Sequence, residues 1–299
     1  MTFEPVFPAL PLDEWEDTKE TLHRYVQIVG KVRLEYSPFR NHWWHVPLYV
    51  TARGLTTSSI PYGSKVFEIS FDLMENRLVV STSEDEGFAF AMDNLPVAEF
   101  YRRFFDGLAA IGIDVSIDTR PFELGDEHTL DENVLHCVCD REYVRRYWRV
   151  LVQVDQIFKE FAGRFNGKTS PVQLYWHSFD LALTRFSGRR APEREGRVER
   201  EAYSHEVISF GFWPGDRNVR MPAFYSYTAP EPDGLTDQPL RPQEAFWAPE
   251  GGTALLMYDD VRAKDSPKET LLEFLESAYQ AGAKTAGWDI KELRAVPAV

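Results

Sequence analysis

Residues 176–185, WHSFDLALTR, repeat the pattern of residues 44–53, WHVPLYVTAR, and this repetition governs how the chain is divided. In each stretch a Trp-His pair is followed by an arginine eight residues after the histidine. The differences 177 − 45 and 185 − 53 both equal 132, so the two stretches align without a gap. With eight Trp and seven His in 299 residues, about 0.2 Trp-His pairs are expected by chance, so two matching pairs indicate an internal duplication.

The segments around each Trp-His pair favour the same division of the chain. A helical pattern precedes both pairs, and aligning VQI at 26–28 with VQV at 152–154 needs an offset of 126. Strand-like runs follow both pairs and lead into an amphipathic helix, at residues 95–112 and 267–282. The order helix, strands, helix is therefore predicted twice. The alternative is that two unrelated α+β stretches align by coincidence.

The predicted fold class is α+β with a mostly antiparallel sheet, because hairpin-like spacing dominates over βαβ alternation. Residues 1–125 form the first repeat and residues 126–299 the second, related by a pseudo-twofold axis. Both repeats are expected to share one core, because no flexible Gly/Ser linker separates them. The predicted strands include residues 43–52, 113–117 and 172–186, and a hairpin is predicted with its turn at residues 74–76.

The net charge of −14 excludes the partners that need a basic surface, so neither nucleic acid nor an anionic membrane is expected to bind. No run of about 18 apolar residues is available to span a bilayer. The first residues lack the basic and apolar regions of a secretory signal, which predicts a cytosolic location. The absence of G-x-G-x-x-G, Walker and G-x-S-x-G patterns leaves the cofactor unknown and gives little support to nucleotide-cofactor or serine-hydrolase chemistry.

The leading functional hypothesis is an aromatic-walled pocket for a small polar or anionic metabolite, which could also be the substrate of an enzyme. If residues 43–52 form a strand, His45, Tyr49 and Arg53 share one face of it. The predicted binding residues are Trp44, Tyr49, Arg53, Trp176 and Arg185, with the two arginines holding an anion. The predicted acid–base residues are His45, His205 and Glu206, since imidazole titrates near neutral pH.

Asp180 is a second point of interest, because it lies in an apolar strand next to Phe179 and Leu181. A buried carboxylate needs a partner, and an arginine from elsewhere in the chain is the expected one. A structural ion pair and a catalytic carboxylate are equally compatible with the sequence.

Two other classes of function stay open. A metal-dependent enzyme would use His45, His205 and Glu206, with His42 or His177 as a fourth ligand. A non-catalytic interaction protein would use the Pro-rich segment 230–252, in which Phe246 and Trp247 are candidate anchors. Trp247 is expected to be mostly buried against its own chain. The oligomeric state cannot be derived from the sequence.

The strings NHWWHVPLYVTARGLTTSSIPYG, LALTRFSGRRAP and REAYSHEVISFGFWPG resemble an uncharacterised bacterial family that is classed as a domain of unknown function. The resemblance covers nearly the whole chain and implies a cytosolic bacterial protein. It implies no activity, cofactor or catalytic residue. Gly rather than His is common in that family at the position of His177, which disfavours a metal site formed by the three histidines His45, His177 and His205.

Overall fold

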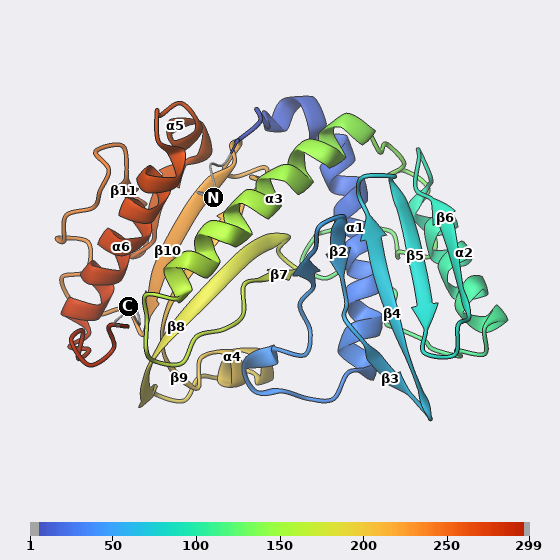
Figure 1. Cartoon of the computed structure of the whole chain (residues 1–299), viewed down its shortest axis with the longest axis horizontal. Helices are drawn as coiled ribbons and strands as arrows, with labels where there is room; N and C mark the ends of the chain where they lie inside the picture. The colour runs from blue at the N-terminus through green and yellow to red at the C-terminus, as the bar shows by residue number, and fades with distance from the viewer. Residues whose placement is uncertain (1–5, 296–299) are drawn as a thin grey trace.

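Two antiparallel sheets, each accompanied by long helices, make up the protein in a computed structural model that describes residues 6–295 (Figure 1). The long helices are α1 (Leu12–Tyr36), α2 (Val97–Ala110), α3 (Arg141–Ala162) and α6 (Pro267–Thr285). Short helical turns are η1 (Asn41–Trp43), α4 (Arg197–Ala202) and α5 (Tyr258–Arg262). The chain therefore has the predicted α+β composition.

The first sheet has the order β1-β2-β4-β5-β6, with β3 paired to β4. Its strands are β1 (Tyr49–Val50), β2 (Gly54–Thr56), β3 (Ile60–Tyr62), β4 (Lys65–Asp72), β5 (Arg77–Thr82) and β6 (Gly87–Ala91). The second sheet has the order β11-β12-β10-β9-β8-β7. Its strands are β7 (Gln173–Tyr175), β8 (Asp180–Arg190), β9 (His205–Trp213), β10 (Ala223–Ala229), β11 (Phe246–Trp247) and β12 (Ala254–Met257).

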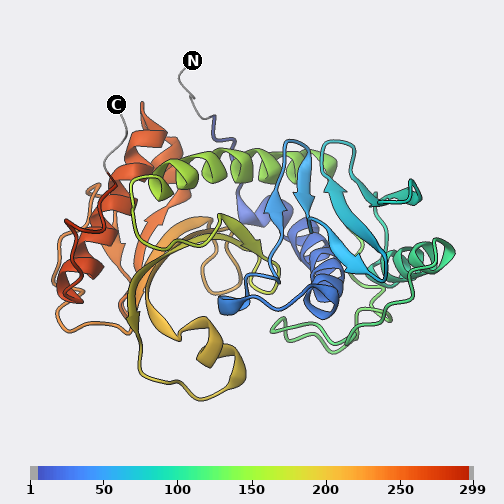
Figure 2. The same cartoon turned by 60° about the horizontal axis from the view of Figure 1, so that its bottom comes forward.

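Local sequence signals explain where the long helices begin and end. The Asp140 carboxylate caps α3 by accepting from the backbone N–H groups of Glu142 and Tyr143. Helix α1 ends before Pro38, which disfavours helical backbone at Ser37. Helices α3 and α6 pack on one face of the curved second sheet and leave its other face to α4 and the η1 segment (Figure 2).

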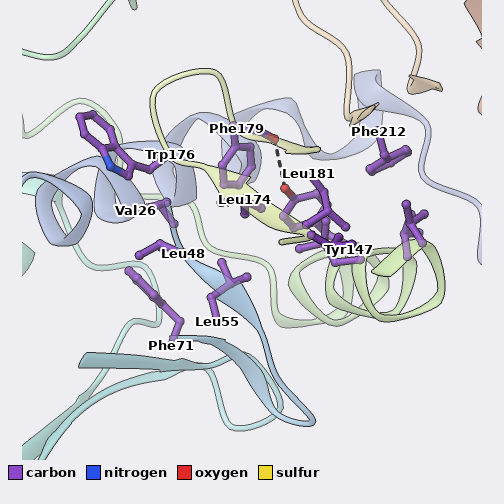
Figure 3. Close-up of a cluster of buried hydrophobic side chains, with 14 of the residues drawn as sticks. Val26, Leu48, Leu55, Phe71, Tyr147, Leu174, Trp176, Phe179, Leu181 and Phe212 are labelled. Atoms are coloured by element: carbon purple, nitrogen blue, oxygen red, sulfur yellow. Dashed lines mark hydrogen bonds between the residues drawn. The ribbon is translucent and has the colours of Figure 1, made fainter. Parts of the chain in front are cut away.

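Buried side chains run continuously from one half of the chain to the other (Figure 3). At the join, Leu48 and Leu174 exchange backbone hydrogen bonds of 2.9 and 2.8 Å, so β1 and β7 lie side by side. Tyr147 of α3 donates to the carbonyl of Phe179 at 3.3 Å and fixes the turn that follows β7. The assignment of 1–125 and 126–299 as two repeats stays a prediction, and so does their duplication.

Three of the predicted strands need correction. Residues 43–52 hold only the short strand β1, because His42 and Trp43 adopt left-handed backbone, with φ of 57° and 61°, and the chain turns there. Residues 172–186 are divided into β7 and β8 by a turn in which the Phe179 N–H donates to the Tyr175 carbonyl at 2.8 Å. Residues 113–117 form no strand. The predicted hairpin is confirmed, since β4 and β5 pair on either side of residues 73–76.

Across residues 6–295, no helix combines the length and the apolarity that crossing a membrane requires.

Candidate functional site

A cavity of about 450 Å³ lies on the face of the second sheet that α3 and α6 leave uncovered. Its volume is typical of small-molecule sites. The floor is formed by alternate residues of three strands: Ala182, Thr184 and Phe186 of β8, Val207 and Ser209 of β9, and Tyr225 and Tyr227 of β10. The remaining walls come from η1, α4, the β7–β8 turn and the segment at Phe122-Glu123.

Tyr225 reaches along the floor because residue 211, opposite it in the sheet, is a glycine. A Cβ atom at Gly211 would lie 2.2 Å from Cζ of Tyr225 and 2.4 Å from its hydroxyl oxygen. No other residue therefore fits beneath the phenol ring without moving it. Tyr227 continues the row, and its hydroxyl lies 3.1 Å from that of Tyr203.

Asp180 is the buried carboxylate of the cavity, with 7% of its surface exposed. The hydroxyl of Ser178 donates to its Oδ1 and the hydroxyl of Tyr225 donates to its Oδ2. Burial, followed by the nearby Asp180 charge, raises the pKa of Tyr225 well above its usual value, so this phenol keeps its proton. The expected arginine partner is not there: within residues 6–295, Asp180 is held by neutral hydroxyl donors.

His177 lies beside Asp180, in the turn between β7 and β8. Burial lowers the pKa of His177, although the charges of Asp180 and Glu123 act in the opposite direction. The turn contains a further left-handed residue, Phe179, at φ 62°. Strained backbone of this kind is common where a fold holds functional side chains in place.

Helix α1 holds two walls of the cavity through buried polar side chains. His23 Nε2 lies 2.9 Å from the carbonyl oxygen of Trp176 and 3.1 Å from that of His177, so this nitrogen carries the proton. Gln27 clamps Phe122 by donating to its carbonyl at 3.0 Å and accepting from its N–H at 2.8 Å. Both contacts join α1 to segments roughly 100 or more residues away in the chain, so they fix tertiary structure.

The opposite wall is the contact between η1 and α4. Trp43 donates its indole N–H to the Val198 carbonyl at 3.1 Å, and the His42 N–H donates to Glu201 Oε1 at 2.7 Å. Trp43, Trp44 and His42 all line the cavity. No residue of α4 is buried, so η1 supplies much of what holds this helix over the site.

Two of the predicted binding residues, Trp44 and Trp176, line the cavity. Arg185 lies on the opposite face of β8, only 1% exposed, with its guanidinium carbon 3.5 Å from the centre of the Phe161 ring. Strand alternation explains this location, because Arg185 sits between Thr184 and Phe186, which both face the cavity.

The other predicted residues lie outside the cavity lining. Arg53 is bound to Asp72 in an ion pair of 2.9 Å, and the Arg33 guanidinium lies 5.4 Å from the ring centre of Tyr49. His45 stacks on Trp43 and accepts from the Arg40 N–H at 3.3 Å. The side chains of His205 and Glu206 diverge: His205 contacts Ser204, and Glu206 accepts from Ser187, Arg189 and Trp288.

A metal site of the predicted composition is not assembled. Among residues 6–295, no group of three His, Cys, Asp or Glu side chains is arranged to hold a metal ion. Strand alternation is one reason: His205 and Glu206 are adjacent on β9, so their side chains point to opposite faces of the strand. The predicted binding residues did not include Asp180, which the sequence offered as an ion-pair or a catalytic carboxylate, and they missed three further lining residues, Tyr175, Tyr225 and Tyr227. Alternation of Tyr225 and Tyr227 in β10 is the sequence signal that could have revealed them.

The profile of a family described as "Family of unknown function (DUF5996)" matches residues 7–295. The chain belongs to this family. No curated protein and no solved structure matches the chain significantly. The resemblance to a domain of unknown function is therefore confirmed, whereas bacterial origin and a cytosolic location stay predictions.

Proposed function

We propose that the cavity binds a small organic cation, an amine or a quaternary ammonium compound, with its charge against Asp180 and its carbon atoms against the aromatic walls. The observation that carries this proposal is the buried Asp180 carboxylate, whose hydrogen-bond donors are the neutral hydroxyls of Ser178 and Tyr225. A buried charge without an opposite charge is unfavourable, and a cationic ligand would supply that charge.

The charge of the other lining residues supports a cation over an anion. Among the described residues that line the cavity, Glu123 and Glu199 are acidic and none is lysine or arginine. The two arginines expected to hold an anion lie elsewhere, Arg53 beside Asp72 and Arg185 in the core. The predicted small polar ligand is therefore retained, and its preferred charge is positive.

The aromatic walls add a second source of affinity. Trp43, Trp44 and Trp176 line the cavity, together with Tyr203 and Phe186. A cation over the face of such a ring gains about 0.5–2 kcal/mol, and tryptophan gives the strongest interaction. Several rings and one carboxylate together are the arrangement by which proteins recognise ammonium groups.

A thermal-shift experiment on the purified protein tests the proposal with choline, tetramethylammonium and 1,4-diaminobutane. The neutral isostere of choline, 3,3-dimethylbutan-1-ol, has the same shape without the charge. At a ligand concentration of 100 times Kd, a bound cation stabilises the folded state by about 2.7 kcal/mol, which raises Tm by several degrees. The alcohol and the anion succinate are expected to leave Tm unchanged.

Asp180→Asn removes the charge at nearly constant size and is expected to abolish the shift. Asp155→Asn is the matched control, because Asp155 is a buried carboxylate of α3 that pairs with Lys159 outside the cavity. It should keep the response to the cation. Equal responses to choline and its neutral isostere, or an undiminished response in Asp180→Asn, would contradict the proposal.

We further infer that the cavity borders the join of two duplicated halves. Leu48 and Leu174 form a reciprocal backbone pair, and their spacing of 126 residues equals the offset that aligns the helical segments 26–28 and 152–154. Reciprocal contact between equivalent residues is what a twofold axis produces. This contact supports aligning the two halves with the offset of 126, which the helical segments give, rather than with the offset of 132, which the Trp-His stretches give. A superposition of the two halves at 126 that fails to match α1 to α3 would refute the inference.

The interaction module is less well supported than the cation site. Phe246 is 42% exposed, but Trp247 is half-buried and donates its indole N–H to the Gln238 carbonyl at 2.9 Å. The segment is thus attached to its own chain, and Trp247 packs against the core as expected.

A further inference from the structure

Lys168 lies beside Trp44 and Phe186, two residues of the cavity wall. Its backbone carbonyl accepts from the Phe186 N–H at 3.0 Å, and Phe186 is six positions after Asp180 on β8, about 20 Å along an extended strand. The Lys168 ammonium nitrogen lies 4.9 Å from the ring centres of both Trp44 and Phe186. These two rings line the cavity, so the amine is in contact with its wall.

His42 is the hydrogen-bond partner of this amine. Lys168 Nζ lies 2.8 Å from His42 Nε2, and His42 Nδ1 lies 3.2 Å from the carbonyl oxygen of Glu201. Because a carbonyl oxygen only accepts, Nδ1 carries a proton. Nε2 of the neutral ring therefore has a free electron pair for the Lys168 ammonium, and the pair can share one proton.

The surroundings lower the pKa of both groups. Burial lowers the pKa of Lys168. Burial and then the Lys168 charge lower the pKa of His42. Glu201 acts in the opposite direction on both, and His205, whose ring centre is 5.5 Å from that of His42, lowers the pKa of His42 further. Lysines become nucleophiles when desolvation and a neighbouring base deprotonate them.

We propose that Lys168 is a nucleophilic lysine that condenses with an aldehyde or ketone, with His42 as the base that takes the proton from its ammonium. The free amine attacks the carbonyl carbon, so an N–C bond forms and the carbonyl electron pair moves to oxygen. His42 returns its proton to this oxygen, and a second proton passes to it from the nitrogen. The C–O bond then breaks and the oxygen leaves as water, so the products are a protonated imine on Lys168 and one water molecule. This proposal is independent of the cation site.

Reductive trapping with propanal and sodium cyanoborohydride tests the proposal on the whole protein. The rate of propylation at each lysine is measured by peptide mass spectrometry after cleavage at glutamates. The exposed Lys291 is the internal reference, and Lys264 is a slow one, because its ion pair with Glu244 raises its pKa. At about pH 7, Lys168 is expected to react at least ten times faster than Lys291. An equal or slower rate at Lys168 would overturn the proposal.

His42→Asn removes the accepting nitrogen and suits the left-handed backbone at this position, because asparagine tolerates a positive φ. It is expected to reduce the rate at Lys168 several-fold and to leave Lys291 unchanged, whereas an undiminished rate would refute the role of His42. Lys168→Arg removes the adduct at this site. If His42→Asn does not fold, the pH profile of the wild-type protein decides: the Lys168 rate must rise at lower pH than the Lys291 rate, and coinciding profiles would refute the proposal.

Discussion

Replacing Gly30 by alanine is expected to destabilise the protein, although alanine is the better helix former. Gly30 lies inside α1, where alanine alone would gain about 1 kcal/mol. A Cβ atom at this position would, however, lie 2.2 Å from Cγ and 2.3 Å from Cδ1 of Trp176. The indole is only 3% exposed and forms a wall of the cavity, so the steric conflict falls on a fixed group.

The size of the effect follows from these contacts. To reach an ordinary carbon contact of about 3.5 Å, the indole must retreat by about 1.3 Å. That movement strains the hydrogen bond from the indole N–H of Trp176 to the Val46 carbonyl, which measures 3.2 Å and is worth about 1 kcal/mol. Overpacking of a rigid core adds about 1–3 kcal/mol. After the helix gain is subtracted, the free energy of unfolding should fall by about 1–3 kcal/mol.

Urea denaturation of Gly30→Ala and Gly107→Ala measures this effect against a matched control. Gly107 lies inside α2, and its Cβ would meet the Phe88 ring at 2.5 Å, but Phe88 is a half-exposed residue of the edge strand β6 and can move. Gly107→Ala should therefore lose much less stability. Adding Trp176→Leu to Gly30→Ala should make the alanine nearly harmless, which a double-mutant cycle reveals. A Gly30→Ala protein as stable as the wild type would refute the reasoning.

Two further predictions concern buried basic side chains. Arg185→Met should keep the free energy of unfolding within about 1 kcal/mol of the wild type and preserve any response to choline. Arg185→Lys should lower the free energy of unfolding by about 1–3 kcal/mol, because an ammonium cannot stack on Phe161 as a guanidinium does. Equal urea midpoints for the two variants would contradict this prediction. Burial lowers the pKa of His23 to about 3, so the unfolded chain takes up the proton first and the free energy of unfolding falls as pH drops from about 6.5 toward 3. His23→Gln should make that slope shallower by up to about 1.4 kcal/mol per pH unit between about pH 6.5 and 5, and an unchanged slope in urea titrations would exclude His23 as its source.

The helices and hairpins of this fold could be predicted because their signals are local. Helix α1 ends where Ser37-Pro38 forbids helical backbone, and β4 and β5 meet at a turn closed by Asn76, which adopts φ 51°. The single strand expected at residues 43–52 was wrong, because the same succession of aromatic and apolar residues can form a turn as well as a strand. What breaks the strand is left-handed backbone at His42 and Trp43, which the contacts with α4 hold in place.

The candidate site was harder to predict, because alternation along a strand separates two faces without showing which of them faces a ligand. On β8, Asp180, Thr184 and Phe186 face the cavity while Arg185 enters the core. An arginine among aromatic rings is as suitable for a core as for an anion site, since its guanidinium stacks on rings in both. The two faces of the sheet differ because α3 and α6 cover one of them, whereas α1 holds the two loops that border the cavity on the other. The positive charge proposed for the ligand rests on the absence, among residues 6–295, of a basic partner for Asp180. An absence of that kind becomes visible only when all the elements around the carboxylate are assembled.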